Sequence, residues 1–141
     1  MSSFFMEMTN TDAVVKNPLW WKEIVPLFLK VGEGFEIRHW REDEETIKKY
    51  SSWGKISEED SGDFEVSLKG SFTKEIIYKL LMEEKPEERE KMTDFFSINI
   101  GRFHSSHYGK EIAIDDIKED EREFIRKVLL SLNDCFNIVV S

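Results

Sequence analysis

Apolar and polar residues alternate along several short segments of the chain, which is the pattern of β-strands with one buried face. The alternation is clearest at 64–72, where Phe64, Val66, Leu68 and Phe72 are separated by mostly polar residues. We therefore expect these four side chains to face the core. Other patterns predict a short strand or an ordered arm within 3–15 and strands at 35–40, 96–103, 111–115 and 136–140.

Other segments repeat their apolar residues every three or four positions, as amphipathic helices do. Asn17 and Pro18 have the form of an N-cap and a first helical residue before the apolar stripe of 19–29, and Pro26 should kink or end that helix early. Thr73 is expected to cap a helix that follows it. The remaining predicted helices are a charged one within 41–50, a short acidic one from Pro86 to about Asp94, and one that opens with an Asp116–Glu119 capping box.

The order of these elements predicts the fold class. Some strands are separated by helices, whereas two follow each other directly as a hairpin, and this mixture indicates an α+β fold. We expect a single domain over 1–141, with a largely antiparallel sheet covered on one face by helices. No internal repeat, low-complexity tract or linker-like stretch divides the sequence.

The chain is strongly acidic, with 29 Asp and Glu against 20 Lys and Arg and a formal net charge of −9. Nonspecific nucleic-acid binding comes mainly from cations that neutralise phosphates, so this charge argues against a direct nucleic-acid partner and favours a basic protein partner. No apolar stretch is long enough for a membrane span, and Glu7 interrupts the apolar run near the N-terminus, so we expect a soluble, cytoplasmic protein. The single cysteine, Cys135, allows no intrachain disulfide and is expected to be buried where the last strand begins.

Two of the three histidines, His104 and His107, lie in the stretch Phe-His-Ser-Ser-His-Tyr-Gly-Lys at 103–110. The interpretation we favour is a hairpin loop of about six residues in which Gly109 takes a positive φ. A metal site would need further ligands, for which His39 is the remaining histidine, and an acid/base pair would need cations beside it. We expect no metal, no cofactor and no catalytic residue.

Aromatic and acidic residues gather in 41–63, where a protein interface could form. Aromatic anchors supply buried hot spots in such interfaces, and carboxylates around them attract a basic partner. Alternatively, Trp53 covers the edge of the core. Trp20 and Trp21 lie on the apolar side of the first helix and are expected to belong to the core. If the interface lies elsewhere, the 103–110 hairpin with Tyr108 at its tip is the next candidate. The predicted partner-binding residues are Tyr50, Trp53, Glu58, Glu59, Asp60 and Asp63.

A small, acidic, single-domain α+β chain with a Leu19-Trp20-Trp21 helix near its N-terminus and no catalytic signature resembles the immunity proteins of bacterial polymorphic toxin systems. These include antidotes to contact-dependent and wall-associated toxins. The resemblance implies an antitoxin that binds a cognate toxin domain, often a nuclease, and blocks its active site. Two alternatives remain open: a small hydrolase or metal-dependent enzyme that uses His39, His104 and His107, and an adaptor without a toxin partner.

Overall fold

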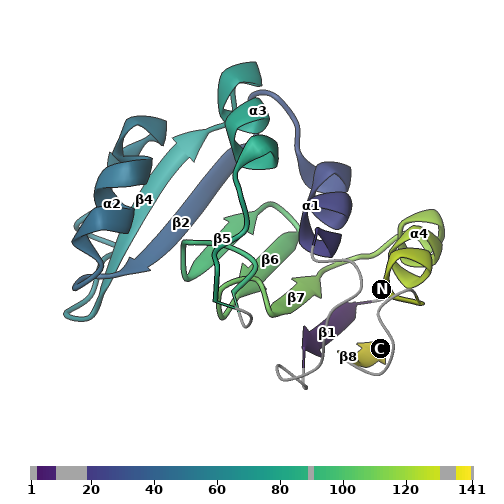
Figure 1. Ribbon diagram of the computed structural model, residues 1–141. Coiled ribbons are helices and arrows are strands. Elements are labelled where there is room, and N and C mark those ends of the chain that lie inside the picture. The colour runs from purple at the N-terminus through teal and green to yellow at the C-terminus, as the bar shows by residue number, and fades with distance from the viewer. Residues whose placement is uncertain (1–2, 9–18, 89–90, 131–135, 141) are drawn as a thin grey trace.

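Eight strands form one sheet in which every neighbouring pair is antiparallel. The computed structural model describes residues 3–8, 19–88, 91–130 and 136–140. The strands are β1 (Phe4–Met8), β2 (Gly34–Trp40), β3 (Lys55–Ile56), β4 (Glu65–Ser71), β5 (Ser97–Ile100), β6 (Phe103–Ser106), β7 (Glu111–Ile114) and β8 (Phe136–Val140). Their order across the sheet is β3-β4-β2-β5-β6-β7-β1-β8 (Figure 1). The predicted α+β class is confirmed.

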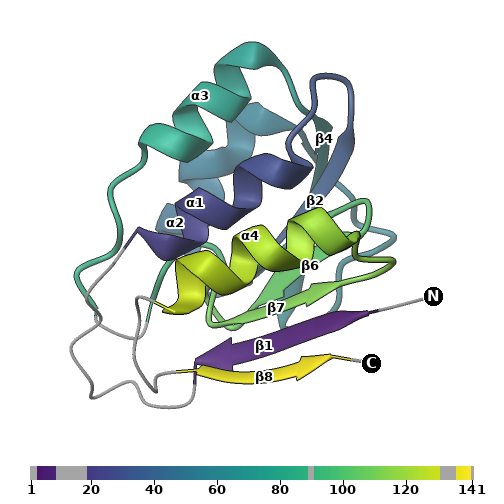
Figure 2. The same cartoon turned by 90° about the vertical axis from the view of Figure 1, so that its right-hand side faces the viewer.

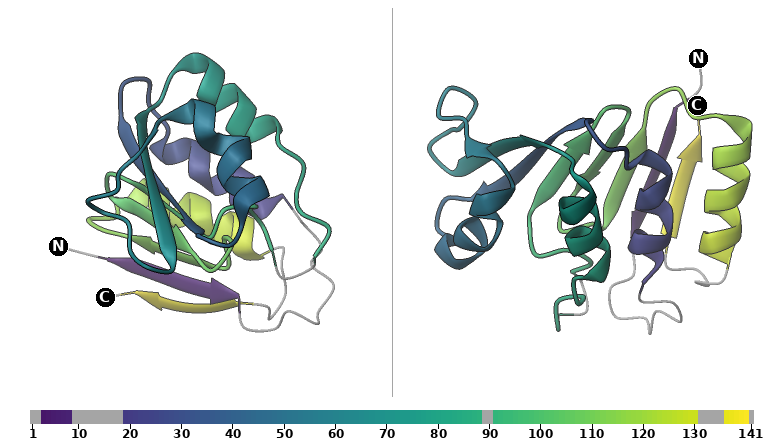
Figure 3. Two further views of the ribbon diagram at one scale, coloured as in Figure 1. Left: turned by 90° about the vertical axis from the view of Figure 1, so that its left-hand side faces the viewer. Right: turned by 90° about the horizontal axis from the view of Figure 1, so that it is seen from above.

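The helices lie on one side of this sheet (Figures 2 and 3), as the sequence predicts. They are α1 (Trp20–Ile24), α2 (Glu44–Tyr50), α3 (Lys74–Met82) and α4 (Glu119–Leu130), and short 3-10 turns, η1 (Val25–Phe28) and η2 (Ser51–Trp53), extend α1 and α2. Pro26 lies in the first turn of η1, so the α-helix ends early as expected. The Thr73 hydroxyl accepts a hydrogen bond from the backbone N–H of Ile76 at 3.1 Å, which confirms the predicted cap. No helix in the described residues is long and apolar enough to cross a membrane.

The core lies between the helices and the face of the sheet that they cover. Register places one row of inward residues across six strands, and all of them are almost fully buried: Leu68, Ile37, Ile98, Ser105, Ile112 and Met6. The polar member of this row is satisfied, because the indole N–H of Trp21 donates to the Ser105 hydroxyl at 2.9 Å. Trp20 and Trp21 are both buried, which confirms the prediction that they belong to the core.

Phe64 does not face the core, and here the sequence prediction is wrong. Its side chain is 77% exposed, whereas Val66, Leu68 and Phe72 are buried. The cause is the end of the strand pairing: the ladder between β2 and β4 ends at the Trp40–Glu65 pair, one residue after Phe64. Phe64 lies outside this ladder, so its side chain need not follow the alternation of inward and outward residues along the strand.

Three other predictions need correction. The described residues of 86–94 contain no helix, and the segment 96–103 is two strands separated by a turn in which Gly101 has a φ of 53°. The last helix begins at Glu119, and the carboxylate of Glu121 accepts from the Lys118 backbone N–H at 2.9 Å, so the predicted Asp116–Glu119 capping box does not form in that register. The predictions for Asn17, Pro18 and Cys135 lie outside the described residues.

Candidate functional site

The 103–110 stretch is half strand and half turn. Residues 103–106 form β6, so His104 lies in the sheet and not in a loop. The turn that follows has three successive positive φ angles, 53° at His107, 58° at Tyr108 and 85° at Gly109. A Cβ built on Gly109 would lie 2.7 Å from the Met92 Cβ and 3.2 Å from a carbon of the Trp21 ring. The predicted role of Gly109 is therefore confirmed, and close packing adds a second reason for glycine there.

The three histidines do not share one site. His39 faces the helices with the buried residues of β2 and stacks on the ring of Tyr50 at 5.7 Å, while His104 lies on the opposite, open face. His107 lies 3.5 Å from the Glu111 carboxylate at the turn. Within the described part of the chain, no three histidine, cysteine or acidic side chains are placed to hold a metal ion together.

Both ring nitrogens of His104 face polar partners within the protein. The amide nitrogen of Asn99 donates to the Glu36 carboxylate at 3.1 Å, so the Asn99 oxygen faces the His104 Nδ1 at 2.9 Å. The Nε2 atom of His104 lies 3.0 Å from the Asp115 carboxylate. A general base needs a nitrogen within reach of the proton that it removes, and both nitrogens of His104 already have partners.

His39 is buried without a hydrogen-bond partner for either ring nitrogen among the described residues. Burial disfavours the charged imidazolium and lowers the pKa of His39 from 6.5 to about 4, although the charge of Asp43 acts in the opposite direction. The ring is therefore neutral at physiological pH. It lies in the core and is not accessible to a substrate.

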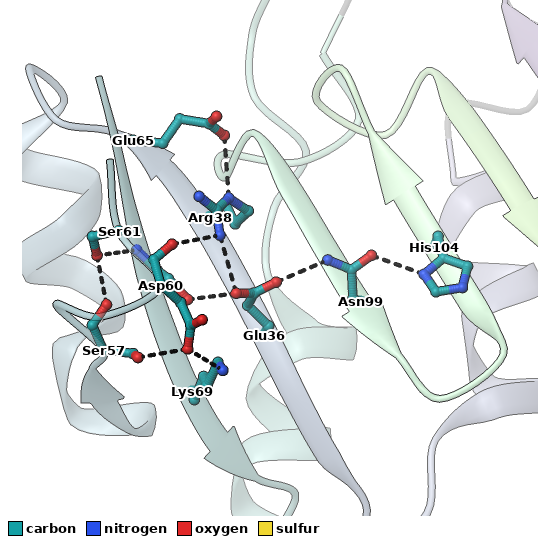
Figure 4. A network of polar contacts seen from close by, with 10 residues as sticks. Glu36, Arg38, Ser57, Asp60, Ser61, Glu65, Lys69, Asn99 and His104 are labelled. Carbon is teal, nitrogen blue, oxygen red and sulfur yellow. Dashed lines mark hydrogen bonds and ion pairs between the residues drawn. The ribbon is translucent and has the colours of Figure 1, made fainter. Parts of the chain in front are cut away.

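A network of polar contacts covers part of the open face of the sheet (Figure 4). Its centre is Glu36, whose carboxylate accepts hydrogen bonds from Arg38 at 3.1 Å, from Ser67 at 2.5 Å and from Asn99 at 3.1 Å. Arg38 also contacts the Glu65 carboxylate at 3.3 Å. Each of these acids therefore has a partner within the protein.

The predicted partner-binding residues fall into two groups on different faces. Tyr50 is 0% exposed and Trp53 is 7% exposed, and their rings pack at 4.7 Å on the helix side of the sheet. Asp60 belongs to the network on the open face, because it pairs with Lys69 and accepts a hydrogen bond from Ser57. The other three acids, Glu58, Glu59 and Asp63, are exposed. Trp53 thus lies at the edge of the core, as the alternative interpretation of the sequence predicted. The six predicted residues do not form one surface.

An open groove of about 470 Å³ lies where β2 ends and β4 begins. We call it the Trp40–Phe64 groove, and it is lined by Trp40, Arg41, Glu42, Asp63 and Phe64. Two contacts of Arg41 hold its walls together: the backbone N–H donates to the Phe64 carbonyl at 2.7 Å, and the guanidinium donates to the Gly62 carbonyl at 2.9 Å. The groove therefore combines two aromatic side chains with two carboxylates and one cation whose position is fixed.

The hairpin tip extends this aromatic surface. The ring of Phe96 lies 4.8 Å from that of Trp40 and 5.4 Å from that of Tyr108, and His107 contacts Phe96 at 5.3 Å. Burial, followed by the negative charge of Asp43, raises the pKa of Tyr108. Acidic groups thus lie close enough to the hairpin to act on it electrostatically.

Sequence reasoning missed this groove because it placed Phe64 in the core. The available signal was the position of Asp63-Phe64 directly after Gly62, at the boundary between the loop and the strand. Comparison of the chain with models of known protein families, with curated proteins and with solved structures finds no match. A function must therefore be inferred from the chain's own residues.

Proposed function

We propose that the protein is an immunity protein, or antitoxin, that binds a basic toxin domain stoichiometrically and occludes its active site. The binding surface is centred on the Trp40–Phe64 groove and the hairpin tip, and the exposed acids of the neighbouring loop form its rim. The observation that carries the proposal is Phe64, a large apolar side chain that is 77% exposed beside carboxylates. An aromatic side chain within a charged rim is the arrangement found at interface hot spots.

Compared with the interface predicted from the sequence, the proposed surface has a different aromatic centre and keeps part of the acidic rim. Tyr50 and Trp53 have little free surface to offer, whereas Trp40, Phe64 and Tyr108 lie at the surface or partly so. Of the predicted acids, Asp63 lines the groove, and Glu58 and Glu59 lie in the loop that leads to it. Asp60 supports the loop through its contacts with Lys69 and Ser57.

The proposed partner is a nuclease toxin domain that acts in the cytoplasm. A nuclease needs a basic surface to hold phosphates, and a net charge of −9 attracts such a surface over long distances. Carboxylates of the immunity protein then take the place of substrate phosphates. Inhibition of this kind requires neither a catalytic group nor a cofactor in the inhibitor.

The test begins with the neighbouring upstream gene, which we expect to encode a secreted protein with a basic C-terminal domain, and then uses that domain as the partner. We expect a one-to-one complex by calorimetry and protection of cells when both proteins are expressed. Phe64→Ala should weaken binding by about 2 kcal/mol, or roughly thirtyfold, if Phe64 is a hot spot. Because Phe64 is exposed, this variant should fold normally.

The matched control is Tyr78→Ala on α3, which removes an aromatic side chain that is 65% exposed on the helix side. Its affinity should equal that of the wild type. Loss of binding in Tyr78→Ala with full affinity in Phe64→Ala would place the interface on the helices. Absence of both binding and protection would contradict the antitoxin proposal.

A further inference from the structure

We propose that the Trp40–Phe64 groove receives one arginine side chain of the basic partner. This inference rests on the proposed function and adds the chemistry of its central contact. The occupant follows from the lining, since two aromatic and two acidic residues line the same open volume of about 470 Å³.

The carboxylates of Glu42 and Asp63 make no hydrogen bond or ion pair among the described residues. In this they differ from the acids of the open face, such as Glu36 and Glu65, each of which contacts Arg38. The two carboxylates of the groove are therefore available to a cation from outside.

A cation inside the protein could already fill this role, and Arg41 is the candidate. Its guanidinium, however, donates to the Gly62 carbonyl, and it makes no ion pair with Glu42 or Asp63. One cation also stands against two carboxylates in the lining, so the groove keeps an excess of negative charge. Arg41 positions the loop that carries Asp63 and leaves the groove open.

Arginine fits this lining better than lysine. Its planar guanidinium stacks on aromatic faces and donates in a fork to carboxylates, whereas an ammonium ion is compact and strongly hydrated. Tryptophan offers the strongest cation–π surface of the aromatic side chains, and both Trp40 and Phe64 line the groove. Carboxylates at the rim would then complete the contact.

The experiment uses a short uncharged peptide with one central arginine, and two analogues with citrulline or lysine in its place. Peptides are titrated into the labelled full chain, and amide and indole resonances are followed by NMR, with Trp40→Phe identifying the indole signal of Trp40. The arginine peptide should shift the Trp40 indole and the Phe64 amide saturably. Citrulline, which has the same shape without the charge, should bind about tenfold more weakly or not at all.

Two double variants provide the matched comparison. Glu42→Gln with Asp63→Asn removes two charges from the groove, and Asp120→Asn with Glu123→Gln removes two exposed charges from α4. Only the first should abolish the shifts. Equal weakening in both variants, equal binding of citrulline, or equal binding of lysine would overturn the arginine assignment.

The outcome for the whole partner separates this inference from the proposed function. If the toxin domain binds and Phe64→Ala weakens it, but the arginine peptide does not shift the groove, the arginine assignment fails and the antitoxin function stands. If the peptide binds as expected and no basic domain binds, the antitoxin function fails and the assignment stands.

Discussion

At the scale of single residues, His39 is an ionisable group kept neutral inside the core. Its pKa is about 4 in the folded protein and 6.5 in a solvated chain, so below pH 6.5 the unfolded state binds more protons than the folded state. Stability is therefore lost as the pH falls from 6.5 to 4. Complete titration of this group would cost about 3 kcal/mol.

We predict that His39→Leu removes this part of the pH dependence, because leucine has nearly the same volume and does not titrate. The free energy of unfolding of both proteins is measured in urea at pH 7 and at pH 4.5. Between these two pH values, the wild type should lose more stability than the variant. Paired carboxylates also lose stability in acid, but they do so equally in both proteins. If His39→Leu has the same pH profile as the wild type, the pKa of His39 does not differ between the folded and the unfolded state.

At the scale of secondary-structure elements, the hairpin between β6 and β7 depends on one glycine. Gly109 and Gly32 have nearly the same φ, 85° and 91°, but only Gly109 has neighbours within 4 Å of an added Cβ. The two positions therefore separate backbone strain from packing.

We predict that Gly32→Ala costs about 1 kcal/mol of unfolding free energy, from the left-handed backbone alone. Gly109→Ala should cost about 1–3 kcal/mol more, because its methyl group would collide with Met92 and Trp21. Chemical denaturation measures both. Equal losses would mean that Met92 moves aside without cost.

The elements show which structure the sequence pattern contains and which it does not. Strands such as β2 and helices such as α3 follow from local periodicity, because one face of each is buried. The segment from Pro86 has a plausible helix start, but the backbone N–H groups of Met92 and Thr93 donate to the Tyr108 carbonyl, a partner distant in sequence. Exposure of Phe64 likewise depends on where β2 stops pairing. Local periodicity carries no information about contacts between segments that are distant in the sequence. The candidate groove is formed by such contacts, so the sequence pattern did not predict it.

At the scale of the whole molecule, negative charge governs the approach of a basic partner. We predict that Glu58→Lys with Glu59→Lys slows association several-fold and weakens its dependence on salt, while dissociation changes little. Stopped-flow kinetics with the toxin domain measures both rates. Asp60 is left unchanged because its contacts with Lys69 and Ser57 support the loop.

The control for this prediction is Asp120→Lys with Glu123→Lys on α4, which changes the net charge by the same amount. A smaller effect there would show that the loop lies near the interface. Identical rates for the two variants would mean that attraction depends on net charge alone and that the loop is remote from the partner.

The position of β1 in the sheet has a consequence for biosynthesis. Among the described strands β1 is synthesised before the other seven, yet its neighbours in the sheet are β7 and β8, which are synthesised after β2–β6. Until they exist, the apolar side chains of Phe4, Met6 and Met8 have no sheet to join, whereas β5, β6 and β7 can pair with one another as they emerge. We expect the nascent chain to expose an apolar segment that chaperones of nascent chains can bind. In pulse-labelled hydrogen exchange during refolding, the amides of β1 should be the last to become protected.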